Sequence, residues 1–207
     1  MAELERVRPL VWTDGRASAG AACLATWLVS VELGTSRRAS RAAASASYAE
    51  ERVIDTTTSR LFDVAALAAI SGGIAASLAR PAASIRTRRT SYFAGACLLG
   101  GSGVLSASAR RHLGRFHRDA LTVHADHQLV ETGPYRRVRH PLYTATIGVF
   151  VGIGAVLGNW ISLALAGLPT LALIRRIHVE EDMLVKALGP DYLRYQERTA
   201  RLVPGVW

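Results

Sequence analysis

Apolar residues in this chain are gathered into five blocks that alternate with polar, arginine-rich segments. A helix needs roughly 20 apolar residues to cross the hydrocarbon layer of a membrane, and the blocks approach that length. The pattern therefore predicts an all-α integral membrane protein with about five transmembrane helices. The predicted spans cover residues 17–34, 61–79, 91–108, 141–157 and 161–174.

The last two blocks are predicted to form a helical hairpin. Only residues 158–160 (Gly-Asn-Trp) separate them, and these residue types favour a tight turn. Pro169 should kink the fifth helix, because proline interrupts the backbone hydrogen-bond ladder. The fifth block is short for a full crossing. We therefore expect the helix to continue until Gly189 and Pro190 end it, with a short helical tail beyond.

The distribution of basic residues gives the predicted spans an orientation. If the C-terminal tail is cytoplasmic, the cytoplasmic segments contain 18 arginine and lysine residues, and the segments on the other side contain 7. Cytoplasmic loops of membrane proteins are enriched in these residues, so we expect a cytoplasmic C-terminus. The same enrichment explains the net charge of +9, and we expect no nucleic-acid partner.

A single membrane domain is expected over residues 1–207. Its N-terminal part, residues 1–108, contains the first three predicted helices. Its C-terminal part, residues 109–207, contains the hairpin and most of the residue patterns that suggest chemistry.

Two polar boxes lie at the two ends of the predicted hairpin. The first polar box is Arg139-His140-Pro141-Leu142-Tyr143, and the second polar box is Glu180-Glu181. A hairpin returns both of its ends to one side of the membrane, so the boxes should face each other. Proline disfavours helix at the preceding residue and suits the first helical position. His140 should therefore sit at the very start of the fourth helix.

Each polar box allows two interpretations. The start of a helix offers free backbone N–H groups and a positive dipole end, and Arg139 with its neighbouring arginines adds charge. This combination suits a carboxylate or a phosphate, but a basic cytoplasmic border alone would also explain the arginines. Glu180 lies four residues after Arg176 and could pair with it. Alternatively, its carboxylate could bind an ammonium group or ribose hydroxyls of a ligand.

Two further patterns are candidate ligand sites. The glycine-rich run at residues 100–103 lies within the third predicted span, where small residues permit either close helix packing or the approach of a cofactor. His124 and His127 lie in the polar loop before the hairpin. Nothing nearby completes a tetrahedral ligand set at the usual spacing, so we expect no metal site.

More motifs accompany the polar boxes in the C-terminal part of the chain. They are His127-x-Leu129-Val130, Gly133-Pro134-Tyr135-Arg136, Leu184, Gly189-x-x-Tyr192-x-x-Tyr195 and Arg201-x-x-Pro204. In this order and at this spacing, they resemble the isoprenylcysteine carboxyl methyltransferase and phospholipid methyltransferase family. The first half of the chain has no matching motif beyond its apolar spans.

The resemblance implies an integral membrane enzyme whose cofactor, S-adenosylmethionine, binds at the cytoplasmic side. The residues implied in cofactor binding are His140, Tyr143, Glu180, Glu181, Gly101 and Gly103. The two glycines would correspond to a glycine-bearing helix of the phospholipid N-methyltransferases. Arg139 or Arg176 would be catalytic, by holding a carboxylate of the cofactor or of the substrate.

The expected reaction is direct methyl transfer to a lipophilic acceptor that reaches the site from the membrane lipid. A carboxylate such as an isoprenylcysteine-type substrate is preferred, because the arginines of the first polar box can bind it through two hydrogen bonds. A phospholipid amine and a small thiol are alternative acceptors. Two other classes remain open: a relative of the NADPH-dependent membrane reductases, and a non-enzymatic membrane protein on the same scaffold.

Overall fold

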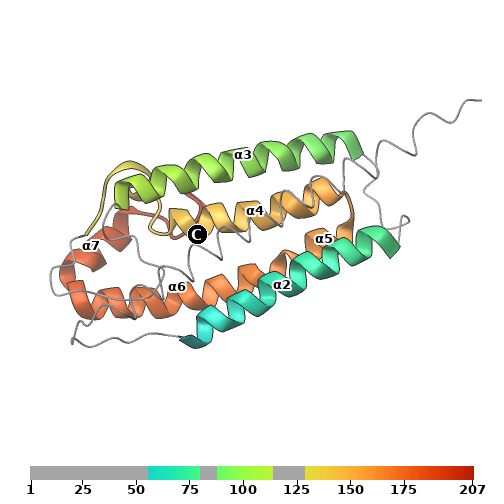
Figure 1. Ribbon diagram of the computed structural model, residues 1–207. Coiled ribbons are helices and arrows are strands. Elements are labelled where there is room, and N and C mark those ends of the chain that lie inside the picture. Colours follow the sequence, from blue (N-terminus) through green and yellow to red (C-terminus); the bar gives the residue numbers. More distant parts are fainter. Residues whose placement is uncertain (1–55, 80–87, 114–128) are drawn as a thin grey trace, which may run out of the picture.

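The computed structural model describes residues 56–79, 88–113 and 129–207 (Figure 1). These ranges are helical, apart from short connections and one isolated parallel bridge between Val138 and Ala200. The first predicted span, residues 17–34, lies outside the described residues, as do His124 and His127.

The described ranges contain six α-helices and one short 3-10 helix. They are α2 (Thr56–Ala79), α3 (Arg88–Leu113), η3 (Gly133–Arg136), α4 (Pro141–Leu157), α5 (Trp160–Leu165), α6 (Gly167–Leu188) and α7 (Pro190–Arg198). Three helical stretches are long and apolar enough to cross a membrane, namely Thr57–Ser77, Thr90–Leu113 and Trp160–Leu188. The predicted all-α membrane fold is confirmed for the described residues. The total of about five spans stays a prediction.

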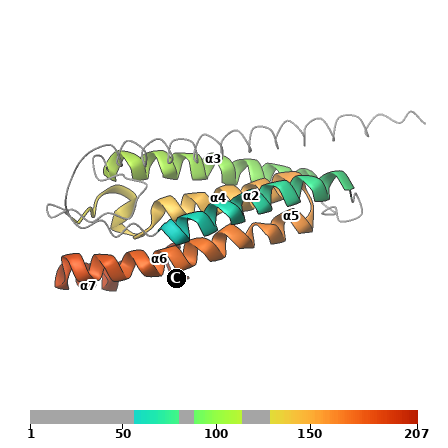
Figure 2. The ribbon, with the colours of Figure 1, turned by 60° about the horizontal axis from the view of Figure 1, so that its bottom comes forward.

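The long helices run along one axis as two packed pairs (Figures 1 and 2). One pair is α3 with α4, and the other is α2 with the α5–α6 segment. An apolar layer joins the pairs, in which the rings of Phe62 and Phe150 meet edge to face, with their centroids 6.1 Å apart. Other large apolar side chains point outward, as contact with lipid requires, among them Val64, Leu67, Phe93, Val104 and Leu171.

The predicted tight turn closes the hairpin between α4 and α5. Gly158 ends α4 in the left-handed conformation, with a φ of 66°, which suits a residue without a side chain. Asn159 then caps α5, because its side-chain oxygen accepts the Ser162 N–H at 2.7 Å. The Asn159 amide nitrogen also donates to the Ser77 hydroxyl at 2.5 Å, which fastens the turn to the end of α2.

The second helix of the hairpin is interrupted at Ala166, between α5 and α6 and three residues before Pro169. Pro169, which was expected to kink this helix, is the physical cause. It has no N–H for the Leu165 carbonyl, and its ring crowds that carbonyl, so the helix breaks nearly one turn before the proline. The predicted span at residues 161–174 is therefore split. Beyond the break, α6 continues through the charged residues and ends at Gly189, as predicted.

Close packing of α3 on α4 depends on glycines that face the other helix. A Cβ atom on Gly95 would lie 2.8 Å from the Gly152 carbonyl oxygen and 2.9 Å from the Val156 backbone nitrogen. Gly148 faces the Ser102 side chain in the same way. Backbone atoms within a helix cannot move aside singly, so any side chain at Gly95 forces the two helices apart.

We predict that Gly95→Ala destabilises the protein by about 1–3 kcal/mol, the usual cost of overpacking. Gly100→Ala is the matched control on the same helix, because no atom of the described residues lies within 4 Å of a Cβ atom at that position. Thermal unfolding of both variants in detergent provides the measurement. Equal melting temperatures would show that the two helices do not approach as closely as described.

Candidate active site

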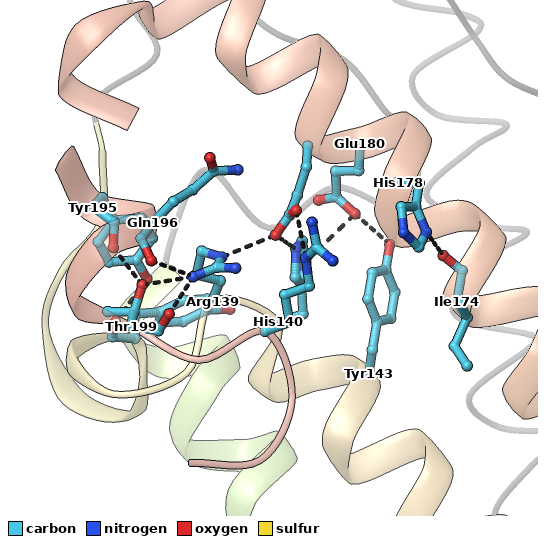
Figure 3. Close-up of polar contacts among 12 residues, drawn as sticks. Arg139, His140, Tyr143, Ile174, His178, Glu180, Tyr195, Gln196 and Thr199 are labelled. Carbon is cyan, nitrogen blue, oxygen red and sulfur yellow. Dashed lines mark hydrogen bonds and ion pairs between the residues drawn. The ribbon is translucent and has the colours of Figure 1, made fainter. Parts of the chain in front are cut away.

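The two polar boxes meet at one end of the bundle, where α4 begins and the charged half of α6 lies (Figure 3). Because α4 starts at Pro141, His140 occupies its N-cap position, and its side chain makes no capping bond. The chain after α7 runs beside this start. The Arg139 N–H donates to the Ala200 carbonyl at 2.8 Å, and the His140 N–H donates to the Arg201 carbonyl at 3.1 Å. The hairpin thus brings the boxes together, and the tail adds a third segment.

Glu181 lies at the centre of this cluster and is only 4% exposed. Its Oε1 accepts from Arg139 Nε at 2.9 Å and lies 3.3 Å from His140 Nε2. Its Oε2 accepts from Arg201 Nε at 2.8 Å. A buried charge is tolerated only when partners of opposite charge lie close, and here two arginines supply them. Both carboxylate oxygens are therefore already bound by the protein.

Arg139 is held on several sides by the protein. Besides its bond to Glu181, its Nη1 donates to the Gln196 carbonyl at 2.9 Å and to both the carbonyl and the hydroxyl of Thr199. The Arg139 side chain is 8% exposed. Through these contacts, Arg139 connects the start of α4 to the end of α7. Its predicted catalytic role gains no support from these contacts.

A second set of contacts links α4, α6 and α2. The Tyr143 hydroxyl donates to Glu180 Oε2 at 2.8 Å and accepts from Arg176 Nε at 2.9 Å. Arg176 Nη1 also donates to the Ser59 hydroxyl at 2.7 Å. Arg176 therefore lies at the junction of three helices, beside both a hydroxyl and a carboxylate of the candidate site.

The two adjacent glutamates differ sharply in their access to ligands. The Glu180 side chain is 26% exposed, whereas that of Glu181 is 5% exposed. The His140 ring stacks on the Tyr143 ring at a centroid distance of 5.5 Å, and His140 Nδ1 lies 3.8 Å from Glu180 Oε2. A partly open carboxylate beside stacked aromatic rings can receive a cationic or hydroxyl-bearing ligand.

Three buried tyrosines lie beside the site, one on η3 and two on α7. The Tyr195 hydroxyl donates to the Tyr135 carbonyl of η3 at 2.6 Å, and Tyr192 lies beside Tyr195 on α7. Burial is the main cause that raises the pKa of all three phenols, and negative charge from Glu180 adds to the increase at Tyr135. The phenols therefore stay neutral hydrogen-bonding groups at physiological pH.

The structure gathers most, but not all, of the predicted site residues. Those it brings together are Arg139, His140, Tyr143, Arg176, Glu180 and Glu181. Gly101 and Gly103 are exposed on α3, with no described atom beyond their own helix within 4 Å of a Cβ atom. Only the intervening Ser102 faces α4. The cofactor contact expected of these two glycines stays a prediction.

Two members of the cluster, Arg201 and Ser59, were not predicted as site residues. Arg201 belonged to a recognised motif, yet nothing in the sequence named Glu181 as its partner. Ser59 is distant from the hairpin in sequence and belongs to none of the motifs. Within the described ranges, no group of three or more His, Cys, Asp and Glu side chains could hold a metal ion.

Comparison with known proteins points to one family. Residues 90–191 match the family model described as phospholipid methyltransferase. The chain is 35% identical over 80 residues to a protein-S-isoprenylcysteine O-methyltransferase of Schizosaccharomyces pombe, which covers 38% of this chain and 34% of that protein. It is 32% identical over 77 residues to the nickel-cobalt-cadmium resistance protein NccN of Alcaligenes xylosoxydans xylosoxydans, covering 37% and 36% of the two chains.

A solved structure shares the fold. It is the eukaryotic intramembrane Ras methyltransferase ICMT, with a TM-score of 0.58 and 23% sequence identity over 74% of this chain and 55% of that one. The aligned regions span about a third of the length of the curated relatives. Together these findings confirm the resemblance inferred from the motifs, and they show that the fold is that of an intramembrane helical protein.

We predict that Arg139→Gln lowers the free energy of unfolding by about 3 kcal/mol, because it breaks a buried ion pair with Glu181 and leaves the Gln196 and Thr199 carbonyls without their donor. Arg198→Gln is the control. Arg198 pairs with Glu131 at 2.5 Å, but their side chains are 58% and 38% exposed, so the loss should stay below about 1 kcal/mol. Denaturant unfolding in detergent compares them. A loss for Arg139→Gln as small as that for Arg198→Gln would contradict the structural role of Arg139.

Proposed function

Since residues 90–191 carry the pattern of the phospholipid methyltransferase family, we propose that this chain is a membrane methyltransferase that uses S-adenosylmethionine and a lipophilic acceptor. The observation that carries the proposal is the meeting of the two polar boxes, with Glu180 partly open beside His140 and Tyr143. These residues lie at the ends of membrane helices, where a soluble cofactor and a lipid can meet.

The donor set fits the charged groups of the cofactor. S-adenosylmethionine carries an ammonium group, a carboxylate, ribose hydroxyls and a sulfonium. Glu180 offers a partly exposed carboxylate for the ammonium or the hydroxyls. The first turn of α4 leaves backbone N–H groups without helical partners, and the side chain of His140 does not cap them. With the positive end of the helix, these groups suit the cofactor carboxylate.

When bound, the cofactor supplies a methyl group already activated by the sulfonium, so the protein has to position the acceptor and exclude water. We assign the orientation of an acceptor carboxylate to Arg176, because Arg139 is buried and fastened to Glu181 and Thr199. The Tyr143 hydroxyl, held by Arg176 and Glu180, fixes the arginine relative to the cofactor side of the site.

The protonation state of the acceptor favours a carboxylate. A carboxylate is ionised at neutral pH and needs no base before it attacks the methyl group. An amine must first lose a proton, and Glu180 would then have to serve as the base while also binding the cofactor. This preference is modest, so a phospholipid amine or a small thiol is the alternative acceptor. The cytoplasmic position of the site, which the arginine distribution favours, belongs to the same proposal.

Two other classes of protein can be distinguished from a methyltransferase by the cofactor that they bind. An NADPH-dependent reductase relative would bind NADPH, and a non-enzymatic protein on this scaffold would bind neither cofactor. One of the relatives is named as a nickel-cobalt-cadmium resistance protein and not as a methyltransferase, so a direct test is needed. Binding of S-adenosylhomocysteine to the purified chain separates these classes directly.

We predict that His140→Ala and Glu180→Gln each weaken the binding of S-adenosylhomocysteine about tenfold, the typical effect of losing a hydrogen bond to a charged group. Asp182→Asn is the control. It removes an exposed carboxylate two residues along α6 and should leave the affinity unchanged. Isothermal calorimetry in detergent measures all three. Wild-type affinity in both test variants would place the cofactor elsewhere.

The acceptor prediction is that turnover requires a lipid-soluble substrate and depends on Arg176. A methyl-transfer assay would compare a prenylcysteine analogue, phosphatidylethanolamine and a short water-soluble thiol. We expect the prenylcysteine analogue to react fastest, and Arg176→Gln to raise its KM at least about tenfold, since a charge-assisted bond to its carboxylate is lost. Turnover of the thiol alone, with neither lipid accepted, would defeat this prediction.

A further inference from the structure

Residues 199–207, which we call the tail strap, cross the start of α4 after leaving α7. The strap is bound to the hairpin through its backbone: the parallel bridge joins Val138 to Ala200, and the Thr144 hydroxyl donates to the Leu202 carbonyl at 2.8 Å. The strap therefore passes directly beside the first polar box. Among the described residues, its one hydrogen bond to the second polar box comes from the side chain of Arg201.

Arg201 is held between two partners. Its Nε donates to Glu181 Oε2 at 2.8 Å, and its guanidinium carbon lies 5.1 Å from the centroid of the Trp207 ring. The Trp207 ring also lies 5.9 Å from the ring of His178 on α6. The Arg201 side chain is 30% exposed, so it forms the rim of the buried cluster, and the indole covers that rim. A cation above an aromatic face is attracted by it, most strongly for tryptophan.

The Trp207 ring is held in this place by a turn of the strap itself. The Leu202 N–H donates to the Trp207 carbonyl at 3.0 Å, and the Trp207 N–H donates to the Val203 carbonyl at 3.1 Å. Gly205 allows the reversal with a φ of 78°, a value that strongly favours glycine. Backbone bonds within the strap thus bring Trp207 back over Arg201.

We propose that Arg201 and Trp207 form a latch that positions the second polar box for cofactor binding. Arg201 and Trp207 are positioning residues: they act through Glu181, whose Oε2 accepts a hydrogen bond from Arg201 and from no other described residue. With that donor missing, the Glu181 carboxylate can turn toward Arg139 and disturb its contact with His140. Glu180 precedes Glu181 on the same helical turn, so its carboxylate loses its fixed place as well. The inference rests on the proposed methyltransferase function.

The test compares cofactor affinity with acceptor KM in four variants. Arg201→Gln should weaken S-adenosylhomocysteine binding about tenfold, as expected for a lost bond to a charged partner. Trp207→Leu should weaken binding about threefold, and Trp207→Phe, which keeps an aromatic face, should stay close to wild type. Arg198→Gln, on the same tail but paired with Glu131, should change nothing. At saturating cofactor, the acceptor KM should change less than about twofold in every variant. General destabilisation of the protein would not weaken cofactor binding while leaving the acceptor KM unchanged.

The double variant Arg201→Gln/Trp207→Leu provides the sharpest outcome. If the two residues act through one contact, the double variant binds no more weakly than Arg201→Gln alone. Additive losses, or wild-type affinity in Arg201→Gln, would overturn the latch. Should Arg201→Gln fail to fold, Trp207→Leu against Trp207→Phe decides the same question.

Hydrogen exchange separates failure of the latch from failure of the proposed function. The amides of His140 and Ala200 bond across the strap, so both Arg201→Gln and Trp207→Leu should speed their exchange, whereas Arg198→Gln should not. If the wild-type chain binds no S-adenosylhomocysteine but exchange still accelerates, the proposed function fails and the latch survives as a contact. If the wild-type chain binds and exchange is unchanged, the latch fails and the proposed function stands.

Discussion

The buried carboxylate of Glu181 is the contact on which the functional end of this molecule depends. Placing one negative charge among apolar helices is costly, and Arg139 and Arg201 reduce that cost from two different segments of the chain. Three segments distant in sequence are thereby joined at one group: the start of α4, the middle of α6 and the strap after α7. Removal of Glu181 would leave two arginines without their carboxylate, and removal of either arginine would take one guanidinium donor from the buried carboxylate. The cluster therefore orders all three segments together.

This arrangement explains why two glutamates stand side by side in the sequence yet have different surroundings. Successive residues on an α-helix point about 100° apart, so one side chain can face the interior while the next faces the rim. Glu181 is saturated by protein donors, whereas Glu180 keeps part of its carboxylate open beside His140 and Tyr143. The inner glutamate gives rigidity, and the outer one is available for a ligand. A site built from Glu180 alone would lack the fixed neighbour that holds its helix turn in place.

Much of the hairpin could be predicted from local rules. Pro141 fixed the start of α4, and Gly158 and Gly189 marked helix ends, because these residues act through their own backbone geometry. The meeting of the two boxes followed from hairpin topology alone. The partner of Arg201 could not be foreseen, since a long flexible side chain can reach many carboxylates. The outward direction of Gly101 and Gly103 was also hidden, because a helix that is apolar on every side does not reveal which face packs on its neighbour.

The two helix pairs are joined in different ways at different positions along the bundle, and this difference supports the proposed location of the ligand. Farther along the bundle from the site, the rings of Phe62 and Phe150 and the small side chains of Ala66 and Ala166 join the two pairs through apolar contacts. At the site, the pairs are connected through hydrogen bonds from the Tyr143 hydroxyl and the Arg176 guanidinium. Close-packed apolar surfaces admit a ligand only by separating, which exposes or empties the contact. Hydrogen bonds between side chains can instead be exchanged for bonds to the head group of a ligand at little cost. Under the proposed function, the level of Tyr143 and Arg176 is therefore where we expect the polar head group of an acceptor to enter the bundle, with its tail among the outward apolar faces of the helices.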